Sequence, residues 1–430
     1  MDNTVNSRNL NRAFILVLDG FGIGAAPDAD KFNDEGADTL GHIAEACFQG
    51  KADRKDIRSE KLAVPFLESL GLGEAYRLAT GRRPAGFKSL ASTFGRYAAC
   101  REISHGKDTS SGHWEIAGAP VLFDWDYFPQ APSFPKWLID SLKHQAGIPG
   151  ILGNCHASGT EIIKELGEEH IGSGKPICYT SIDSVFQVAA HEEGFGLKNL
   201  YSLCEKARQI LDESDSNIAR VIARPFTGSP ENFTRTSNRK DYSVPPPGET
   251  LLDRLKQWGR RVYGVGKIPE IFAGRGITDS VKAPGNDGIF ALVRELAGTA
   301  EPGSLVFANF VDFDMLYGHR RDVTGYACAL ERLDRQLEEI PVMLQPGDLA
   351  VITADHGCDP AFRGSNHTRE YVPALFFGPG IQPGNAGIRD SFSDIGQTVA
   401  FHLGIPPLEY GKTVPGAARS RSCGWSSRLQ

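Results

Sequence analysis

Three runs of mostly apolar residues are each followed closely by carboxylate and histidine side chains. The runs span residues 14–18, 305–311 and 349–352, and none of them alternates between apolar and polar positions. Apolar runs without such alternation are typical of strands that are buried on both faces of a parallel sheet. Helical patterns occur between these runs, for example at 287–296 and 324–337. Strands that alternate with helices predict an α/β fold.

The middle of the chain has a pattern of its own. A stretch rich in aromatic residues and prolines, 123–135, is typical of a linker, and separate strand patterns follow at 177–180 and 220–223. Consecutive prolines at 245–247 then indicate a turn back to the first domain. The sequence therefore predicts an inserted domain. The expected bounds are 1–125 and 247–430 for a discontinuous catalytic core, and 126–246 for an α/β cap that binds substrate.

The bulk composition excludes several classes of protein. With 430 residues the chain is long enough for two hydrophobic cores, and a net charge of −7 offers no basic footprint for nucleic acid. No apolar run approaches the roughly 20 residues that span a bilayer, and the polar residues 1–11 do not resemble a secretory signal. Eight scattered cysteines without a CxxC pair indicate reduced thiols. We therefore expect a cytoplasmic protein without a nucleic-acid, membrane or obligate protein partner.

The polar residues that follow the three runs form a candidate metal centre. They are Asp19 after the first run, Asp314 and His319 after the second, and Asp355, His356 and His367 after the third. Ligands in open α/β sheets gather at the carboxyl ends of the strands. Carboxylate and imidazole together suit Mn²⁺, Zn²⁺ or Fe²⁺, and so large a set suits two ions in phosphoryl transfer. The competing interpretation of each aspartate alone is a helix cap or turn former, and we expect His42 and His113 to be structural.

A threonine motif at residues 106–113 adds a candidate nucleophile. The hydroxyl of Thr109 is a poor nucleophile by itself, and a bound metal would activate it. Lys107 and nearby backbone N–H groups would steady phosphate oxygens. The alternative is a helix N-cap segment. The N-terminus of a helix is also a common phosphate-binding site. Ser110 and Ser111 remain competing hydroxyls.

Arginines of the middle domain are candidates for phosphate recognition. Arg224 and the run 232–239, which ends in Arg239, place several guanidinium groups near one another in the sequence. The guanidinium fork matches phosphate oxygens well. The alternative interpretation is a solvated basic loop.

These residues resemble the phosphopentomutases, a family of the alkaline phosphatase superfamily. The resemblance rests on stretches that run from about residue 14 to about residue 412, among them LVLDGFGIGAAPDA, GKDTSSGHWEIAG, RVIARPFTGSPENFTRTSNRKDY, NFVDFDMLYGHRRD and ITADHGCDP. The cofactor-independent phosphoglycerate mutases share the metal motifs. They use a serine in a different loop, however, and lack the RPFTG and FTRT stretches.

The resemblance implies an alkaline-phosphatase-like core, with a mainly parallel sheet flanked by helices, and two Mn²⁺ ions. Asp19, Asp355, His356 and Thr109 would surround one ion, and Asp314, His319 and His367 would hold the other. Thr109 would carry the phosphoryl group. The residues expected to face the sugar phosphate are Arg224, Arg239, Ser181, Asp183 and Lys267.

The implied reaction interconverts α-D-ribose 1-phosphate and D-ribose 5-phosphate, and the corresponding deoxyribose pair, through a bisphosphate intermediate. A bisphosphorylated sugar would serve as activator, and a closing cap would exclude water from the phosphoenzyme. Pentose phosphates would be the small-molecule partners. The alternatives are a metal-dependent phosphatase or phosphodiesterase, in which water accepts the phosphoryl group, and a catalytically silent sugar-phosphate binder.

The chain departs from the family pattern at a few positions. Ser110 and Ser111 stand where threonine or methionine is expected, Cys358 where asparagine is more usual, and Asn366 where aspartate is usual. Because none of them is an expected ligand, we expect them to tune the surroundings of the site. The charged segment 51–60 is expected to be a solvated insertion.

Overall fold

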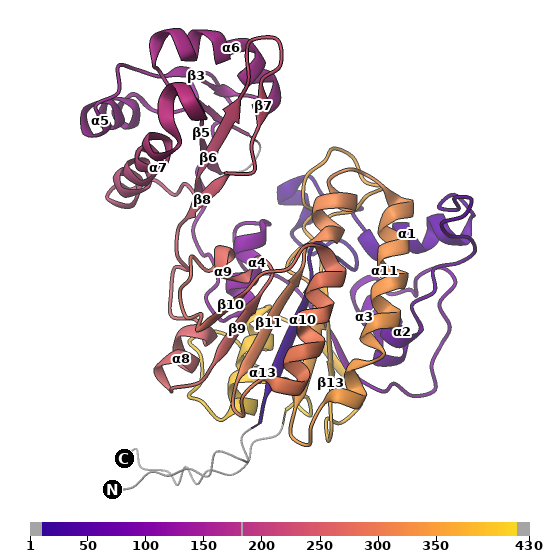
Figure 1. Ribbon diagram of the computed structural model, residues 1–430. Coiled ribbons are helices and arrows are strands. Elements are labelled where there is room, and N and C mark those ends of the chain that lie inside the picture. Colours follow the sequence, from indigo (N-terminus) through magenta and orange to yellow (C-terminus); the bar gives the residue numbers. More distant parts are fainter. Residues whose placement is uncertain (1–10, 182–183, 419–430) are drawn as a thin grey trace, which may run out of the picture. The chain divides into compact units, whose positions relative to one another are not determined.

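The computed structural model describes residues 11–181 and 184–418, which form two compact units (Figure 1). The core unit combines the chain up to Leu122 with the chain from Pro246 onward. The inserted unit is Phe123–Pro245. The polar segment that precedes residue 11 lies outside the described residues. Each unit has its own sheet and its own helices, as expected when one domain is inserted into a loop of another.

The sheet of the core unit is mainly parallel. Within the described residues it has eight strands in the order β10-β9-β11-β1-β12-β13-β2-β14. The block from β10 to β12 is parallel throughout, β13 is antiparallel to both of its neighbours, and β14 is parallel to β2. The strands are β1 (Ala13–Leu18), β2 (Arg96–Cys100), β9 (Val262–Val265), β10 (Asp279–Val281), β11 (Leu305–Phe310), β12 (Leu349–Thr353), β13 (Val372–Phe377) and β14 (Gly384–Arg389).

The three apolar runs form the centre of this sheet. Strand β1 lies between β11 and β12, and every residue of the three strands is buried. Leu18 pairs with Phe310, and Val17 pairs with Thr353. In this register the carboxyl ends of all three strands meet at one edge of the sheet. The chain segments that follow them, with their carboxylates and histidines, are therefore neighbours.

Helices flank the core sheet, and local sequence signals mark their ends. Helix α10 packs against β11, and α13 packs against β1 and β12. Helix α8 begins with a capping box between Thr250 and Asp253, and Asp322 caps α11 by accepting a hydrogen bond from the backbone of Gly325. The helices are α1 (Thr39–Phe48), α2 (Pro65–Leu70), α3 (Leu72–Thr80), α4 (Thr109–Ile116), α8 (Leu251–Gln257), α9 (Ile268–Ile271), α10 (Gly285–Thr299), α11 (Val323–Leu337), α12 (Ile340–Met343) and α13 (Ser393–Leu403), with the short turns η2 (Ala29–Phe32) and η4 (Phe313–Gly318).

The inserted unit is a sheet between two helical layers. Its strand order is β3-β4-β5-β6-β7, with β8 also paired to β6 among the described residues. Helices α5 and α7 contribute to one apolar cluster, and α6 contributes to another. The elements are β3 (Leu152–His156), β4 (Ile177–Thr180), β5 (Val185–His191), β6 (Arg220–Thr227), β7 (Thr234–Arg235), β8 (Lys240–Ser243), α5 (Lys136–Ala146), α6 (Gly159–Ser173), η3 (Glu192–Gly196) and α7 (Leu197–Asp212).

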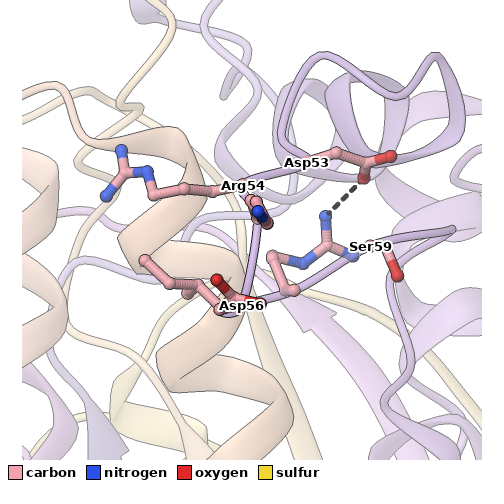
Figure 2. A pocket seen from close by; sticks show the side chains of 7 residues that line it. Asp53, Arg54, Asp56 and Ser59 are labelled. Atoms are coloured by element: carbon pink, nitrogen blue, oxygen red, sulfur yellow. Dashed lines mark ion pairs between the residues drawn. The ribbon is translucent and has the colours of Figure 1, made fainter.

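We expected the charged segment near residue 55 to be a solvated insertion. This prediction is wrong for one residue of the segment, Arg58. The side chain of Arg58 is only 2% exposed. It donates hydrogen bonds to the carbonyl of Ala52 and to Glu331 of α11, so it ties the segment to the core unit. Residues 53–59 surround a shallow hollow of about 520 Å³, and the ion pair drawn in Figure 2 joins Arg58 to Asp53. Burial of a guanidinium requires such partners.

None of the described helices combines the length and the apolar character that a bilayer crossing requires.

Candidate metal centre

The carboxyl edge of the core sheet brings all six predicted metal ligands together. Asp19 directly follows β1, Asp314 lies in η4 just after β11, and Asp355 and His356 follow β12. His319 ends η4, and His367 lies on the loop before β13. Except for His319, whose side chain is 39% exposed, these residues are buried. The parallel register of the three strands is the physical cause of this convergence.

The first group of ligand atoms surrounds His356. Its Nε2 lies 3.5 Å from Oδ1 of Asp19 and 3.3 Å from Oδ2 of Asp355. The Oγ1 atom of Thr109 lies 3.2 Å from the same nitrogen. The backbone N–H of Gly20 donates to the other oxygen of Asp355 at 3.1 Å, which orients that carboxylate. Two carboxylates, one imidazole and the threonine hydroxyl therefore share one small region.

The second group is built on a π-helical turn. The backbone N–H of His319 donates to the carbonyl of Asp314, five residues earlier, at 3.0 Å. This turn places Oδ2 of Asp314 3.3 Å from Nε2 of His319. The other oxygen of Asp314 lies 3.4 Å from Nε2 of His367, whose ring stacks on that of His356 with centroids 3.8 Å apart. The two groups are therefore adjacent.

Backbone carbonyls set the tautomers of the three histidines. Nδ1 lies 3.1 Å from the Gly357 carbonyl in His356, 2.7 Å from the Ser365 carbonyl in His319, and 3.1 Å from the Lys107 carbonyl in His367. A carbonyl oxygen only accepts hydrogen bonds, so in the neutral ring Nδ1 carries the proton and the lone pair lies on Nε2. Metal-ligating histidines commonly have this arrangement.

Buried carboxylate oxygens without hydrogen-bond partners also fit a metal. Oδ1 of Asp19, Oδ1 of Asp314 and Oδ2 of Asp355 are buried and accept no hydrogen bond. Buried polar atoms are nearly always satisfied, so three such oxygens beside three imidazole lone pairs indicate positions for cations. The described residues contain three sets whose ligand atoms lie within 4.8 Å of one another. These sets are Asp19, Asp355 and His356; Asp314, His356 and His367; and Asp314, His319 and Cys358.

The electrostatics of the cluster also favour bound cations. Burial, followed by repulsion from Asp355 and Asp314, raises the pKa of Asp19 well above its usual value. Burial opposes ionisation of Asp355 too, but His356 and His113 outweigh it and lower its pKa to about 2. Burial lowers the pKa of His356 to about 4. The histidines therefore compensate the charge of Asp355, whereas Asp19 is left with repulsion from its neighbours that a divalent cation would relieve.

Helix α4 positions Thr109 at the first group. A Cβ atom on Gly112 would come within 2.0 Å of the Asp355 carbonyl, so only glycine lets the helix approach this closely. Asp108 caps the helix by accepting from the backbone N–H groups of Ser110 and Ser111, and it also accepts from the Ser111 hydroxyl at 2.6 Å. The motif is therefore an N-cap, as the alternative interpretation held. The capping also directs the Ser111 hydroxyl to Asp108 while Thr109 faces the cluster.

Neighbouring residues support this arrangement. Asn309, the polar residue that interrupts the second apolar run, donates to Oδ2 of Asp19 at 3.0 Å. His113 is fully buried and bonds the Thr109 carbonyl through Nδ1 at 2.8 Å, in line with the structural role that we expected. Lys107 forms an ion pair with Asp34 at 2.6 Å, so its ammonium group is already partnered. Sequence reasoning missed Asn309, although its place in an apolar run was a usable signal.

The predicted substrate residues fall into both units. Lys267 belongs to the core unit, where it precedes α9 and acts electrostatically on Asp19. Arg224 lies on β6, and its Nε donates to Gln187 at 3.0 Å. Arg239 forms a two-pronged ion pair with Asp241. Ser181 follows β4 and is half-buried, whereas Asp183 lies outside the described residues.

The arginines of the inserted unit form a positively charged group. Burial, followed by repulsion from Arg239, lowers the pKa of Arg224 to about 10, and Arg235 adds to this repulsion. Tyr179, which sequence reasoning did not single out, is fully buried beside them, and the charged arginines oppose the rise in pKa that burial causes. Repulsion among like charges would be relieved by a bound anion, which favours an anion site here over a solvated basic loop.

Comparisons with known proteins agree with these features. The sequence pattern of the Metalloenzyme superfamily matches residues 11–407. The chain is 58% identical to the phosphopentomutase of Rhizobium meliloti over 405 residues, which cover 94% of this chain and 99% of that protein. It is 57% identical to the phosphopentomutase of Agrobacterium fabrum over 404 residues, with the same two coverages. The chain therefore belongs to the phosphopentomutase family within the Metalloenzyme superfamily, and it is a phosphoryl-transferring isomerase.

Proposed function

We propose that this enzyme interconverts α-D-ribose 1-phosphate and D-ribose 5-phosphate, and the deoxyribose pair, through phosphorylated Thr109. The observation that carries the proposal is the 3.2 Å distance between Oγ1 of Thr109 and Nε2 of His356, inside a cluster of buried carboxylates with unpartnered oxygens. The phosphopentomutase relatives, at up to 58% identity over nearly their whole length, support the choice of substrate class.

We assign two divalent ions to the cluster. Asp19, Asp355 and His356 would hold one of them beside Thr109, and the other would be held by Asp314, His319 and His367. Mn²⁺ suits this mixture of carboxylate oxygen and imidazole nitrogen. When bound, the ions supply positive charge that stabilises the attacking and leaving oxygens of phosphoryl transfer.

In the proposed reaction, phosphorylated Thr109 donates its phosphoryl group to the free hydroxyl of an incoming sugar monophosphate. The bond between phosphorus and Oγ1 breaks as a bond to the sugar oxygen forms, and the sugar's hydroxyl proton passes in net terms to the threonine oxygen. The resulting bisphosphate then returns its other phosphoryl group to Thr109 by the reverse sequence. A bisphosphorylated sugar would also serve as the activator, because it can phosphorylate Thr109 when the enzyme starts without a phosphoryl group.

We assign recognition of the sugar phosphate mainly to the inserted unit. Arg224 and Arg239 would bind phosphate oxygens, with Ser181 and Asp183 as further contacts, and Lys267 of the core unit would contact substrate beside Asp19. Phosphate relieves the repulsion between the two arginines, and it can replace Asp241 as the partner of Arg239.

We propose that the enzyme works in the cytoplasm. Every cysteine among the described residues is unpaired, as expected for a reducing compartment. The substrate class agrees with this location. Phosphorylated sugars do not cross a bilayer unaided, so a pentose phosphate that forms in the cytoplasm stays there.

Phosphorus NMR of the full-length protein tests the reaction. The protein would be loaded with Mn²⁺ and supplied with ribose 1-phosphate and a trace of glucose 1,6-bisphosphate. We expect conversion to ribose 5-phosphate, with dependence on the bisphosphate and without inorganic phosphate. If inorganic phosphate is the main product, the same site belongs to a hydrolase, and the mutase proposal is wrong. If neither product forms although metal binds, the chain is a silent binder.

A further inference from the structure

Cys358 places a thiol inside the metal centre. It is fully buried and follows His356 by two residues. Its backbone N–H donates to the carbonyl of Gly20 at 2.8 Å, which anchors it beside Asp19. Its sulfur belongs with Asp314 and His319 to a set in which all ligand atoms lie within 4.8 Å of one another. The sequence led us to expect only an indirect effect from this residue, and the structure places it among the ligand atoms.

Close packing and a hydrogen bond with Asp314 hold the thiol in place, and its other hydrogen bonds are long. A Cβ atom on Gly318 would come within 2.6 Å of the Cys358 sulfur, so glycine at that position leaves room for the side chain. The contacts of the sulfur with Nη1 of Arg321 and with the carbonyl of Asn366 are both 4.0 Å long, at the limit for sulfur. An ion shared by the sulfur and Asp314 would replace the hydrogen bond between these two side chains.

The other members of the set also have capacity for an ion. Oδ1 of Asp314 is buried without a hydrogen-bond partner. Nε2 of His319 keeps its lone pair, because Nδ1 bonds the Ser365 carbonyl. A thiolate is a soft ligand that selects Zn²⁺ over hard cations such as Mn²⁺ and Mg²⁺. Carboxylate, imidazole and thiolate together form a ligand set of the kind that zinc uses.

We propose that Cys358 is a direct ligand for a thiophilic divalent cation at the Asp314–His319 half of the centre, and that it gives this half a selectivity for Zn²⁺. This inference rests on the proposed dinuclear site and adds a ligand to it. Binding replaces the S–H bond with a metal–sulfur bond, and the proton is released to the buffer. Mn²⁺ would bind the same half through Asp314, His319 and His367 without the sulfur.

The first measurement uses the unaltered, full-length protein. X-ray absorption of the Zn²⁺-loaded enzyme should show zinc–sulfur scattering at about 2.3 Å, the usual zinc–thiolate distance, and because only one of the two ions contacts Cys358 the average should be about half a sulfur per zinc. The Mn²⁺-loaded enzyme should show oxygen and nitrogen neighbours only. Because no substitution is needed, this result does not depend on whether a variant folds. A Zn²⁺ spectrum without a sulfur neighbour would overturn the proposal.

The second measurement compares variants with Cd²⁺ as the probe. Cd²⁺ titration of wild type should produce sulfur-to-metal charge-transfer absorption. Cys358→Ser and Cys358→Asn should lose this absorption and bind Cd²⁺ at least about tenfold more weakly, since even indirect partners of a metal cost tenfold or more. Cys328→Ser is the matched control, because this half-buried thiol of the core unit belongs to none of the ligand sets of the described residues. It should behave as wild type.

The outcomes separate this inference from the proposed function. Absorption that survives in Cys358→Ser would assign the thiolate to another cysteine and overturn the inference, while two bound Mn²⁺ ions per chain would leave the dinuclear site standing. If wild type binds neither Mn²⁺ nor Cd²⁺ by calorimetry, the dinuclear site itself fails, and the proposed function fails with it.

Discussion

The two units hold their functional side chains in different ways. In the core unit the proposed metal ligands follow fully buried parallel strands, and backbone carbonyls fix the rings of the histidines. In the inserted unit Arg239 is 44% exposed on its side chain and is held by an ion pair with Asp241. Ion pairs at the surface contribute little to stability and are readily exchanged. If the proposed sites are correct, the metal centre of the core unit is preformed, whereas the anion site of the inserted unit is completed by substrate.

Removal of the proposed nucleophile should have the largest effect. Thr109→Ala should lower mutase turnover by roughly 10⁴-fold or more, because loss of a nucleophile removes the whole covalent route. Metal content should stay at the wild-type level, since the ligands of the core unit remain. Phosphorus NMR and elemental analysis measure the two quantities. Ser111→Ala is the control, because its hydroxyl is bonded to Asp108, and it should retain turnover. Near-normal rates in Thr109→Ala would move the nucleophile to another hydroxyl.

Removal of a shared ligand tests whether the core site is a dinuclear centre. Asp314→Asn should reduce the bound metal from two ions to one per chain, because Asp314 contacts both His319 and His367. Asp312→Asn is the matched control. Asp312 lies two residues earlier and accepts a hydrogen bond from the backbone of Asn286, so it should keep both ions. Elemental analysis after dialysis measures the stoichiometry, and two fully occupied ions in Asp314→Asn would refute its assignment as a ligand.

A buried histidine far from the metal centre should make the core unit sensitive to acid. Burial lowers the pKa of His402 to about 4, while its Nε2 donates to the Gly347 carbonyl at 2.9 Å. The folded pKa lies below the unfolded value of about 6.5, so stability is complete above that value and falls as the pH drops from 6.5 toward 4. The loss should reach up to about 3 kcal/mol.

His402→Gln should remove this part of the pH dependence, because the amide can still donate to Gly347 but does not titrate. Denaturant unfolding of metal-free protein at several pH values measures the free energy of unfolding in both proteins. If the two curves keep the same pH dependence, His402 is not the group responsible.

Exchange of a charge in the inserted unit should have the smallest effect. Arg239→Gln should raise the KM for ribose 5-phosphate about tenfold, the value of one hydrogen bond to a charged group. The metal content and kcat should change little, because the side chains of the core unit are in place without Arg239. Lys240→Gln is the neighbouring control, since Lys240 contacts exposed Glu205. A loss of bound metal in Arg239→Gln would contradict the separation between the two units.

Local sequence patterns were sufficient for most of the fold. The apolar run at 14–18 forms β1, and the helical pattern at 324–337 forms α11. A strand buried on both faces and a helix buried along one stripe each have a recognisable pattern of apolar residues close together in the sequence. The mainly parallel α/β architecture was therefore predicted correctly. Charge alone misled us at Arg58, which is buried because Glu331, far along the chain, provides its partner. A local pattern does not contain such a partner.

The amino-acid sequence by itself determined which residues are candidates for the chemistry, since carboxylate, imidazole and hydroxyl groups at strand ends are recognisable without coordinates. Their roles as ligands and nucleophile stay predictions. Only the tertiary structure decided which atoms meet. It fixed the Nδ1–H tautomer of His356 through the Gly357 carbonyl, turned Thr109 rather than Ser111 toward the cluster, and brought Cys358 beside Asp314. The physical reason is that the register of the strands and the packing of helices against the sheet bring together residues that are hundreds of positions apart in the sequence. The distances between their atoms exist only in the folded chain.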